Sequence, residues 1–312
     1  MNINILLSTY NGERFLAEQI QSIQRQTIKD WTLLIRDDGS SDGTITIINE
    51  FVKQDKRIRF INGDNNDNLG VIRNFYTLLK YQKADVYFFS DQDDIWLENK
   101  LEVTLLEAQK HDITVPLLVY TDLKVVNQQL AVIHDSMIKT QSDHANTTLL
   151  QELTENTVTG GTMMINHALA KEWFTCDGLL MHDWYLALLA AAKGKLVYLD
   201  IPTELYRQHD ANVLGARTWS KRMRNWFRPH TLISKYWWLI TSSQKQAKLL
   251  LDLQLQPNDR DMVMAYVSLL DQPFTKRLVL LKTYGFRKNR SFHTFIFQSL
   301  VMTLFGYRRK QE

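Results

Sequence analysis

The sequence opens with INILLSTYNG at residues 3–12, a short apolar run that ends in a polar turn. Two similar junctions follow it: WTLLIRDDGSSDGT at residues 31–44 and VYFFSDQDD at residues 86–94. Each apolar run is short and bounded by turn-forming residues, so we predict that each is a strand. The stretches between them carry apolar residues at helical spacing, which favours helical crossovers between parallel strands.

Strand and helix signals continue to alternate beyond these junctions. Strands are predicted at residues 3–8, 31–36, 58–61, 86–90, 163–165 and 196–199, and helices at residues 13–26, 44–53, 69–81 and 185–193. The alternation predicts an α/β fold with a mostly parallel central sheet flanked by helices. In such sheets ligands bind beyond the carboxyl ends of the strands, where loops carry the chemistry.

Composition divides the chain into two parts. Residues 1–210 hold 19 Lys and Arg against 29 Asp and Glu, whereas residues 211–312 hold 18 against 5. We therefore expect a boundary near residue 212, with an α/β domain over 1–212 and a helical extension over 213–312. The only cysteine, Cys176, cannot form an internal disulfide, and no secretory signal pattern opens the sequence. A reducing, cytoplasmic location is expected.

Acidic residues gather where three predicted strands end. A solvated turn would explain any one of these motifs, because Asp, Asn, Ser and Gly are common turn residues. Three such motifs at one sheet edge favour a functional site over simple turns, because clustered carboxylates repel one another and favour a bound cation. Mg²⁺ and Mn²⁺ take oxygen ligands, so Asp91 and Asp93 are predicted to bind one of these metals.

Together, STYNG, DDGSSDGT and SDQDD resemble the nucleotide-sugar domain of family 2 glycosyltransferases over about residues 1–210. The resemblance implies a GT-A fold and an inverting sugar transfer. Its implied nucleotide contacts are Ser8, Tyr10, Asp37 and Asp38, with Arg73 near the base or pyrophosphate and Asp91 at the ribose or metal. Asp93 matches the last acid of the DXD motif, whose metal neutralises the departing diphosphate.

An inverting transfer needs a base that takes the proton of the acceptor hydroxyl. Asp183 in MHDWY, residues 181–185, is the predicted base. Position alone would also suit an N-cap of the amphipathic helix predicted at residues 185–193. The resemblance favours the base, because the family carries an acidic pair here. His182 replaces the first acid, so it would assist the base, orient it or contact the acceptor.

Two further segments complete the predicted site. In TGGT at residues 159–162, Gly160 and Gly161 suit either a close strand approach or a sugar ring lying on the main chain. In LYRQHDANV at residues 205–213, Arg207 suits a phosphate, and His209 suits the metal or a phosphate. Asp94 is assigned to the same phosphate or acceptor region.

The C-terminal part mixes cations with aromatic residues, and no acidic residue lies between Asp210 and Asp252. The residues concerned are Arg217, Lys221, Arg222, Arg224, Arg228 and Lys235, interleaved with Trp219, Trp226, Phe227, Tyr236, Trp237 and Trp238. This pattern predicts attachment to an anionic membrane surface, with a solvated helical bundle as the alternative. Residues 291–307 suit either a core helix or an interfacial one. No stretch suits a membrane span.

Other functional classes fit less well. A nucleic-acid-binding module would use the same basic residues, but zinc-ligand spacing and a base-stacking sheet signature are absent from the sequence, so no nucleic-acid partner is expected. A nucleotidyltransferase would need a glycine-rich basic phosphate loop, which STYNGERF matches poorly.

The segments SDQDDIW, HDW and YRQH also resemble those of bacterial rhamnosyltransferases of cell-surface polysaccharide synthesis. The resemblance implies dTDP-L-rhamnose as the nucleotide-sugar donor. It also implies a saccharide acceptor, polyprenyl-linked, at the inner face of the cell membrane. UDP-hexose donors remain the alternative, because the motifs hold the nucleotide and metal and leave the sugar to the loops.

Overall fold

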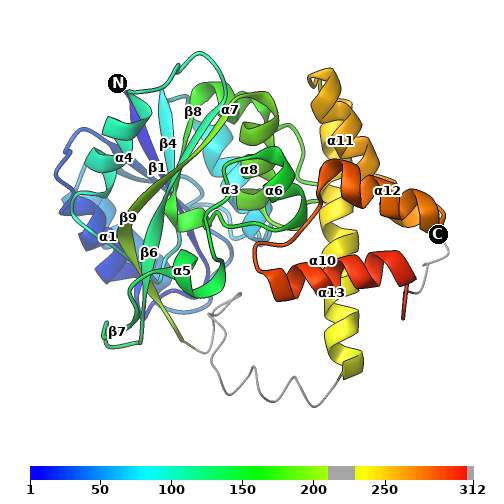
Figure 1. Ribbon diagram of the computed structural model, residues 1–312. Coiled ribbons are helices and arrows are strands. Elements are labelled where there is room, and N and C mark those ends of the chain that lie inside the picture. The colour runs from blue at the N-terminus through cyan, green and yellow to red at the C-terminus, as the bar shows by residue number, and fades with distance from the viewer. Residues whose placement is uncertain (210–228, 308–312) are drawn as a thin grey trace.

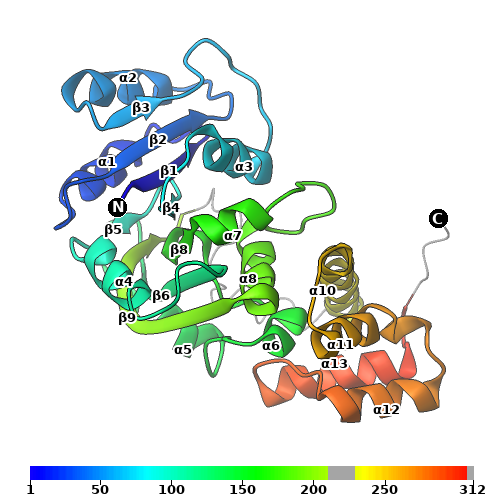
Figure 2. The same cartoon turned by 90° about the horizontal axis from the view of Figure 1, so that it is seen from above.

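The computed structural model describes residues 1–209 and 229–307. The expected boundary near residue 212 lies outside these residues. So do Arg217, Trp219, Lys221, Arg222, Arg224, Trp226, Phe227 and Arg228. Within the described residues, one mixed sheet lies between layers of helices, and a group of C-terminal helices packs beside it (Figures 1 and 2).

The first half of the sheet is parallel, as the sequence predicts. Its strands are β1 (Ile3–Thr9), β2 (Thr32–Asp37), β3 (Ile58–Phe60) and β4 (Val86–Ser90), and its crossover helices are α1 (Leu16–Gln24), α2 (Thr44–Gln54) and α3 (Val71–Tyr81). Ile5 of β1 lies between Leu33 of β2 and Phe88 of β4 in the ladder. The order β3-β2-β1-β4 brings the ends of β1, β2 and β4 side by side, which positions the three polar motifs.

The second half of the sheet is mixed. It contains β5 (Ile95–Trp96), β6 (Leu117–Val126), β7 (Val132–His134), β8 (Met163–Asn166) and β9 (Lys195–Arg207) in the order β4-β8-β6-β9-β5, with β7 on β6. The intervening helices are α4 (Lys100–Ala108), α5 (Met137–Gln141), α6 (Leu149–Thr154), α7 (His167–Glu172) and α8 (His182–Lys193), and a 3-10 turn covers Gly160–Thr162. β8 runs antiparallel to both of its neighbours, whereas β6 and β9 are parallel.

Two sequence-based predictions need correction. β9 does not end at Leu199 but continues through Pro202 to Arg207, because β6 runs alongside and shifts register opposite Pro202. A proline without an N–H is tolerated at such an irregularity. α8 is not amphipathic: its residues are buried almost all round, since α6, β9 and α10 (Pro229–Lys248) pack against it.

The C-terminal helices share the core of the sheet. They are α10, α11 (Pro257–Val267), α12 (Phe274–Tyr284) and α13 (Ser291–Thr303), with 3-10 turns at Leu249–Asp252 and Leu269–Asp271. One cluster of buried apolar side chains runs from the sheet through Trp184 of α8 to Ile240 of α10 and Tyr266 of α11. Figures 1 and 2 both show these helices on the side of the molecule that carries α6 and α8.

A short segment between α12 and α13 fastens the helices to the sheet domain. Thr154 donates from Oγ1 to the carbonyl of Arg287 at 2.5 Å, and the amide of Asn289 donates to the Glu155 carboxylate at 2.8 Å. Arg290 donates to the carbonyl of Thr140 at 2.7 Å. Lys288 is buried and donates to the carbonyl of Thr154. The helical region is therefore held by polar contacts as well as by the shared core.

The ambiguous region 291–307 contains α13, which has one buried face and one exposed face. On α13, Phe297, Leu300 and Val301 are buried, whereas Phe292 and Phe295 are 60% and 70% exposed. Trp237 of α10 is buried and donates its indole N–H to the carbonyl of Phe305 at 2.9 Å, so its expected place on the surface is wrong. In the described part of the chain, every helix is too short or too polar to cross a bilayer.

Candidate active site

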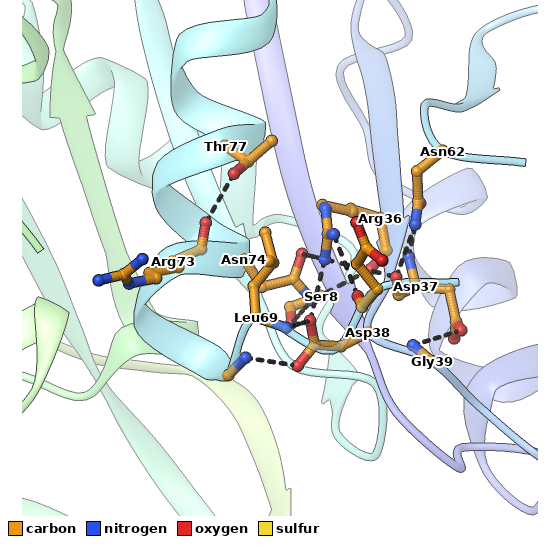
Figure 3. Close-up of polar contacts among 12 residues, drawn as sticks. Ser8, Arg36, Asp37, Asp38, Gly39, Asn62, Leu69, Arg73, Asn74 and Thr77 are labelled. Carbon is orange, nitrogen blue, oxygen red and sulfur yellow. Dashed lines mark hydrogen bonds and ion pairs between the residues drawn. The ribbon is translucent and has the colours of Figure 1, made fainter. Parts of the chain in front are cut away.

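Asp38 organises one end of the site at the tip of β2. Its carboxylate accepts hydrogen bonds from the backbone amides of Leu69 and Gly70, at 2.7 and 2.8 Å, and from the Arg36 guanidinium at 2.9 Å (Figure 3). Gly70 has φ +76°, which lets the chain turn into α3 and present these amides. The predicted nucleotide ligand Asp38 thus joins the end of β2 to the start of α3.

A buried polar network connects Asp38 with Ser8. Asn74 donates to Ser8 Oγ at 2.8 Å and accepts from Arg36 at 3.2 Å. Ser8 and Asp38 therefore come together as predicted contributors, and Arg36 and Asn74 are residues that the sequence reasoning missed. An Arg in a strand and an Asn in a helix carry no local signal of such a network.

Arg73 does not join this group. It lies in α3 next to Asn74, but consecutive residues of a helix point about 100° apart, and Figure 3 shows its side chain directed away from Asp38. Its guanidinium pairs with Asp177 at 2.8 Å, and both side chains are exposed. The structure thus places Arg73 outside the Asp38 network, and its assignment to the base or pyrophosphate stays a prediction.

Asp37 shapes the turn that follows β2. Its buried carboxylate accepts from Thr9 Oγ1 at 2.8 Å, from Ser40 Oγ at 2.6 Å and from the amides of Gly39 and Ser40. All four hydrogen bonds to the Asp37 carboxylate therefore come from other residues of the chain. Asp37 therefore holds the STYNG and DDGSSDGT motifs together.

Tyr10 lies at the edge of the site with its side chain half exposed. The Gln92 amide clamps its backbone, accepting from the Tyr10 amide and donating to its carbonyl at 2.8 Å each. This pair fixes the STYNG turn against the SDQDD loop. The Tyr10 ring is left available to a ligand.

The SDQDD loop carries more negative charge than its surroundings neutralise. Burial, together with the charges of Asp93, Glu204 and Asp183, raises the pKa of Asp91 to about 8. Asp94 is buried, accepts from the amide of Arg207 at 3.0 Å, and has no partner for Oδ2 among the described residues. Burial and the neighbouring carboxylates raise the pKa of Asp94 as well. A divalent cation would relieve this repulsion.

His209 and Asp93 meet, as their assignment to one metal site requires. His209 Nε2 lies 2.6 Å from Asp93 Oδ2, and the imidazole packs against the Phe15 ring with centroids 5.0 Å apart. The described ranges contain no set of three or more His, Cys, Asp or Glu side chains arranged to hold a metal ion. Mg²⁺ in transferase sites is often held by one or two carboxylates with substrate phosphates, which Asp91 and Asp93 fit.

Arg207 is committed to the protein rather than to a phosphate. Its side chain is buried and donates to the carbonyls of Asp93 and Gln128, at 3.1 and 2.9 Å, and to the Glu18 carboxylate at 2.5 Å. The guanidinium also lies 4.6 Å from the Phe15 ring centre. The predicted phosphate contact is therefore corrected: Arg207 holds the SDQDD loop in place.

Asp183 lies in the first turn of α8 and is not its N-cap, which is Met181. Its carboxylate accepts from the amide of Trp184 at 2.5 Å and is 8% exposed. Burial raises the pKa of Asp183 to about 6, while the amides of Trp184 and Gly160 act in the opposite direction. The charge of Asp183 contributes to the raised pKa of Asp91, so the candidate base and the acidic loop interact electrostatically.

His182 points into the core, against the expectation that it serves the acceptor or the base. It is 3% exposed and stacks with Phe75, Phe89 and Trp173 at centroid distances of 4.5, 5.7 and 6.2 Å. Neither ring nitrogen has a hydrogen-bond partner among the described residues, and burial lowers the pKa of His182 to about 3. The ring therefore acts as a neutral aromatic filler.

Gly160 and Gly161 are buried and tightly packed. A Cβ on Gly161 would lie 2.5 Å from Glu204 Oε1, and one on Gly160 would lie 3.2 Å from His182 Nε2. The structure thus supports the close-approach interpretation of TGGT. Glu204 and its partner Lys100, both missed by the sequence reasoning, are fully buried beneath this turn.

Residues 4–174 match the family model described as glycosyl transferase family 2. The chain belongs to this family. The expected family and its GT-A fold are thereby confirmed, and the acidic loop after β4 lies within the matched range. Membership makes the protein a sugar transferase.

Three known proteins illustrate the similarity. The dTDP-rhamnosyl transferase RfbG of Shigella flexneri is 30% identical over 67% of this chain and 74% of its own. The UDP-Glc:alpha-D-GlcNAc-diphosphoundecaprenol beta-1,3-glucosyltransferase WfgD of Escherichia coli is 33% identical over 42% of this chain and 49% of its own. TarS 1-349 of S. aureus, solved with UDP-GlcNAc, has a TM-score of 0.60 at 15% identity, covering 91% of this chain and 80% of that one.

Proposed function

We propose that this family 2 transferase is inverting and metal-dependent, and that it moves L-rhamnose from dTDP-L-rhamnose to a lipid-linked saccharide. The observation that carries the mechanism is the placement of Asp183. A carboxylate with a pKa of about 6 lies next to the acidic loop, where its charge acts on Asp91. One group can thus accept the acceptor proton while the opposite face of the sugar meets the metal and diphosphate.

The metal proposal rests on charge and on residue type. Asp93 contacts His209, the charge of Asp93 acts on Asp91, and the combined negative charge would be offset by Mg²⁺ or Mn²⁺. When bound, such an ion would neutralise charge on the leaving diphosphate. Ser8, Tyr10, Asp37 and Asp38 would hold the nucleotide end, directly or through the network that they build.

Rhamnose is the proposed sugar because RfbG, named as a dTDP-rhamnosyl transferase, matches over two thirds of the chain. The second candidate is a UDP-hexose, favoured by WfgD and by the TarS complex with UDP-GlcNAc. A thermal-shift screen with dTDP, UDP and GDP sugars, with and without Mn²⁺, separates them, since a ligand of the native state raises the melting temperature. A shift with dTDP-rhamnose supports the first donor, a UDP preference supports the second, and no shift with any nucleotide contradicts the transferase proposal.

A small cavity supports a saccharide acceptor near Asp183. About 110 Å³ in volume, it is lined by residues of α5 and by Glu155 to Thr159, which directly precedes Gly160. Its walls carry amides and hydroxyls that suit sugar hydroxyl groups. The cavity therefore adjoins the start of the glycine turn, and we propose that it holds part of the acceptor.

We further propose that α13 rests on an anionic membrane, at the cytoplasmic face. Phe292 and Phe295 share its exposed face, and Trp238 of α10 is 59% exposed. No acidic residue lies between Asp271 and Glu312, whereas Arg287 and Arg290 precede the helix in sequence and basic residues 308–310 follow it. Aromatic residues flanked by cations suit anionic headgroups. A polyprenyl-linked acceptor would be found at such a surface, and no nucleic-acid partner is proposed.

A further inference from the structure

We propose that Lys100 is a positioning residue for sugar transfer: it holds the glycine turn beside Asp183 and links that turn to β9. The inference rests on the proposed function, because it concerns the residue proposed there as the base. Neither Lys100 nor its partner Glu204 belongs to the three motifs that mark the site.

The contacts of Lys100 are fully enclosed by protein. Its Nζ donates to the carbonyl of Gly161 and to Glu204 Oε2, each at 2.5 Å, and both side chains are 0% exposed. The ammonium also lies 4.2 Å from the centre of the Trp96 ring. From the start of α4, Lys100 therefore contacts three other segments: β5, the glycine turn and β9.

The glycine turn passes this constraint to Asp183. Gly160, one residue before the carbonyl that Lys100 holds, packs against His182, the chain neighbour of Asp183: a Cβ on Gly160 would lie 3.2 Å from His182 Nε2. The Gly160 amide also lowers the pKa of the Asp183 carboxyl. On its other side the turn abuts Glu204 Oε1, which leaves no room for a Cβ on Gly161. The turn is thus clamped between Lys100 and Glu204, and its amide is set against the proposed base.

The same pair reaches the acidic loop through the sheet. Trp96 pairs with Glu204 in the β5–β9 ladder, and β5 follows Asp94 directly. The charge of Lys100 also acts on Asp91 and Asp94. Lys100 therefore fixes the distance between the base and the loop that faces the diphosphate, which is the spacing an in-line displacement requires.

Stability alone is a poor explanation for such a pair. Replacing both partners of a buried ion pair by uncharged residues of similar volume is often neutral for folding, whereas removing one partner leaves a buried charge and is costly. A positioning role predicts a loss of rate without a loss of folding. Removing both charges should leave a folded enzyme with a displaced glycine turn, and misplacement of about 1 Å can cost roughly 100-fold in rate.

The test is the double variant Lys100→Met with Glu204→Gln, which removes both charges and keeps the volumes. We expect kcat to fall about 100-fold, with the donor KM within about 3-fold and the melting temperature within about 5 °C of wild type. The matched control is Lys193→Met with Glu172→Gln. This control pair also has a 2.5 Å contact but joins α7 to α8 at a partly exposed position. It should leave kcat unchanged.

Wild-type kcat in the double variant would overturn the inference, as would a loss of kcat that only follows the fraction of unfolded protein. A second readout is hydrogen exchange at the amides of residues 160–162, which should quicken at least 10-fold in the double variant and not in the control. If the wild-type chain transfers no sugar from any nucleotide, the proposed function fails. The exchange result then still decides whether Lys100 holds the turn.

Discussion

His209 Nε2 lies 2.6 Å from Asp93 Oδ2, although 116 residues separate them in the chain. The contact joins the residues just after β9 to the loop that follows β4. It places an imidazole next to the carboxylate that the family resemblance assigns to the metal. An ion that displaced this hydrogen bond would find both ligands already side by side.

Asp93→Ala is expected to abolish the metal-dependent part of nucleotide binding. The loss follows because one of the two carboxylates proposed to hold the ion is removed. In a thermal-shift assay, Mn²⁺ should no longer increase the stabilisation by a nucleoside diphosphate, and EDTA should have the same effect on wild type. Asp30→Ala, at an exposed position, is the control. Transfer that is unaffected by EDTA would remove the metal from the proposal.

Asp183→Asn should lower kcat by about 10²–10⁴-fold, the usual contribution of a general base. The amide keeps the size of the side chain, so nucleotide affinity should change little. Single-turnover transfer and nucleotide-induced thermal shifts, measured on the same preparation, separate the two quantities. A variant with wild-type kcat would exclude Asp183 as the base.

The rate of transfer should depend on pH through Asp183. Burial raises the pKa of Asp183 to about 6, and only the ionised form can take a proton. We therefore expect kcat/KM to be full above this value and to fall about tenfold per pH unit below it. The pH profile of kcat/KM measures this directly. The residual activity of Asp183→Asn should lack the acid limb, and a limb that persists there would belong to another group.

Phe292→Ser together with Phe295→Ser should weaken binding to vesicles of phosphatidylglycerol by at least tenfold, because two exposed rings on α13 are lost. Co-sedimentation measures the bound fraction, and vesicles of phosphatidylcholine alone report the dependence on headgroup charge. Phe174→Ser removes a 48% exposed ring near α7 and should have no effect. Undiminished binding of the α13 variant would leave the membrane contact to other residues.

His182→Phe should preserve folding and acceptor KM. The imidazole lies among aromatic rings without a polar partner in the described part of the chain, so a phenyl ring of similar size removes two buried polar atoms and should cost less than about 1.5 kcal/mol. Chemical denaturation and acceptor titration test this. An acceptor KM raised tenfold with unchanged stability would restore the acceptor role expected from the sequence.

The sequence predicted the first four strands and the three motifs at their ends because both depend on local periodicity and turn chemistry. It could not predict side-chain direction. Arg207 lies in a functional-looking segment, yet its guanidinium turns inward to Asp93 and Glu18. His182 and Arg73 each adjoin a residue of the site and point elsewhere, because one step along a helix rotates a side chain by about 100°. Lys100 and Glu204 meet only once β5 and β9 pair.

The core that runs from the sheet into α10 and α11 makes the helices an integral base for the catalytic unit. If α13 lies on a bilayer, the glycine turn and Asp183 are carried at a fixed height and tilt above the lipid, because the described helices share one core with the sheet. A sugar on a polyprenyl carrier would then be accepted only where its own length brings it to that height. Geometry of this kind would let the enzyme select among lipid-linked intermediates by how far each extends from the membrane.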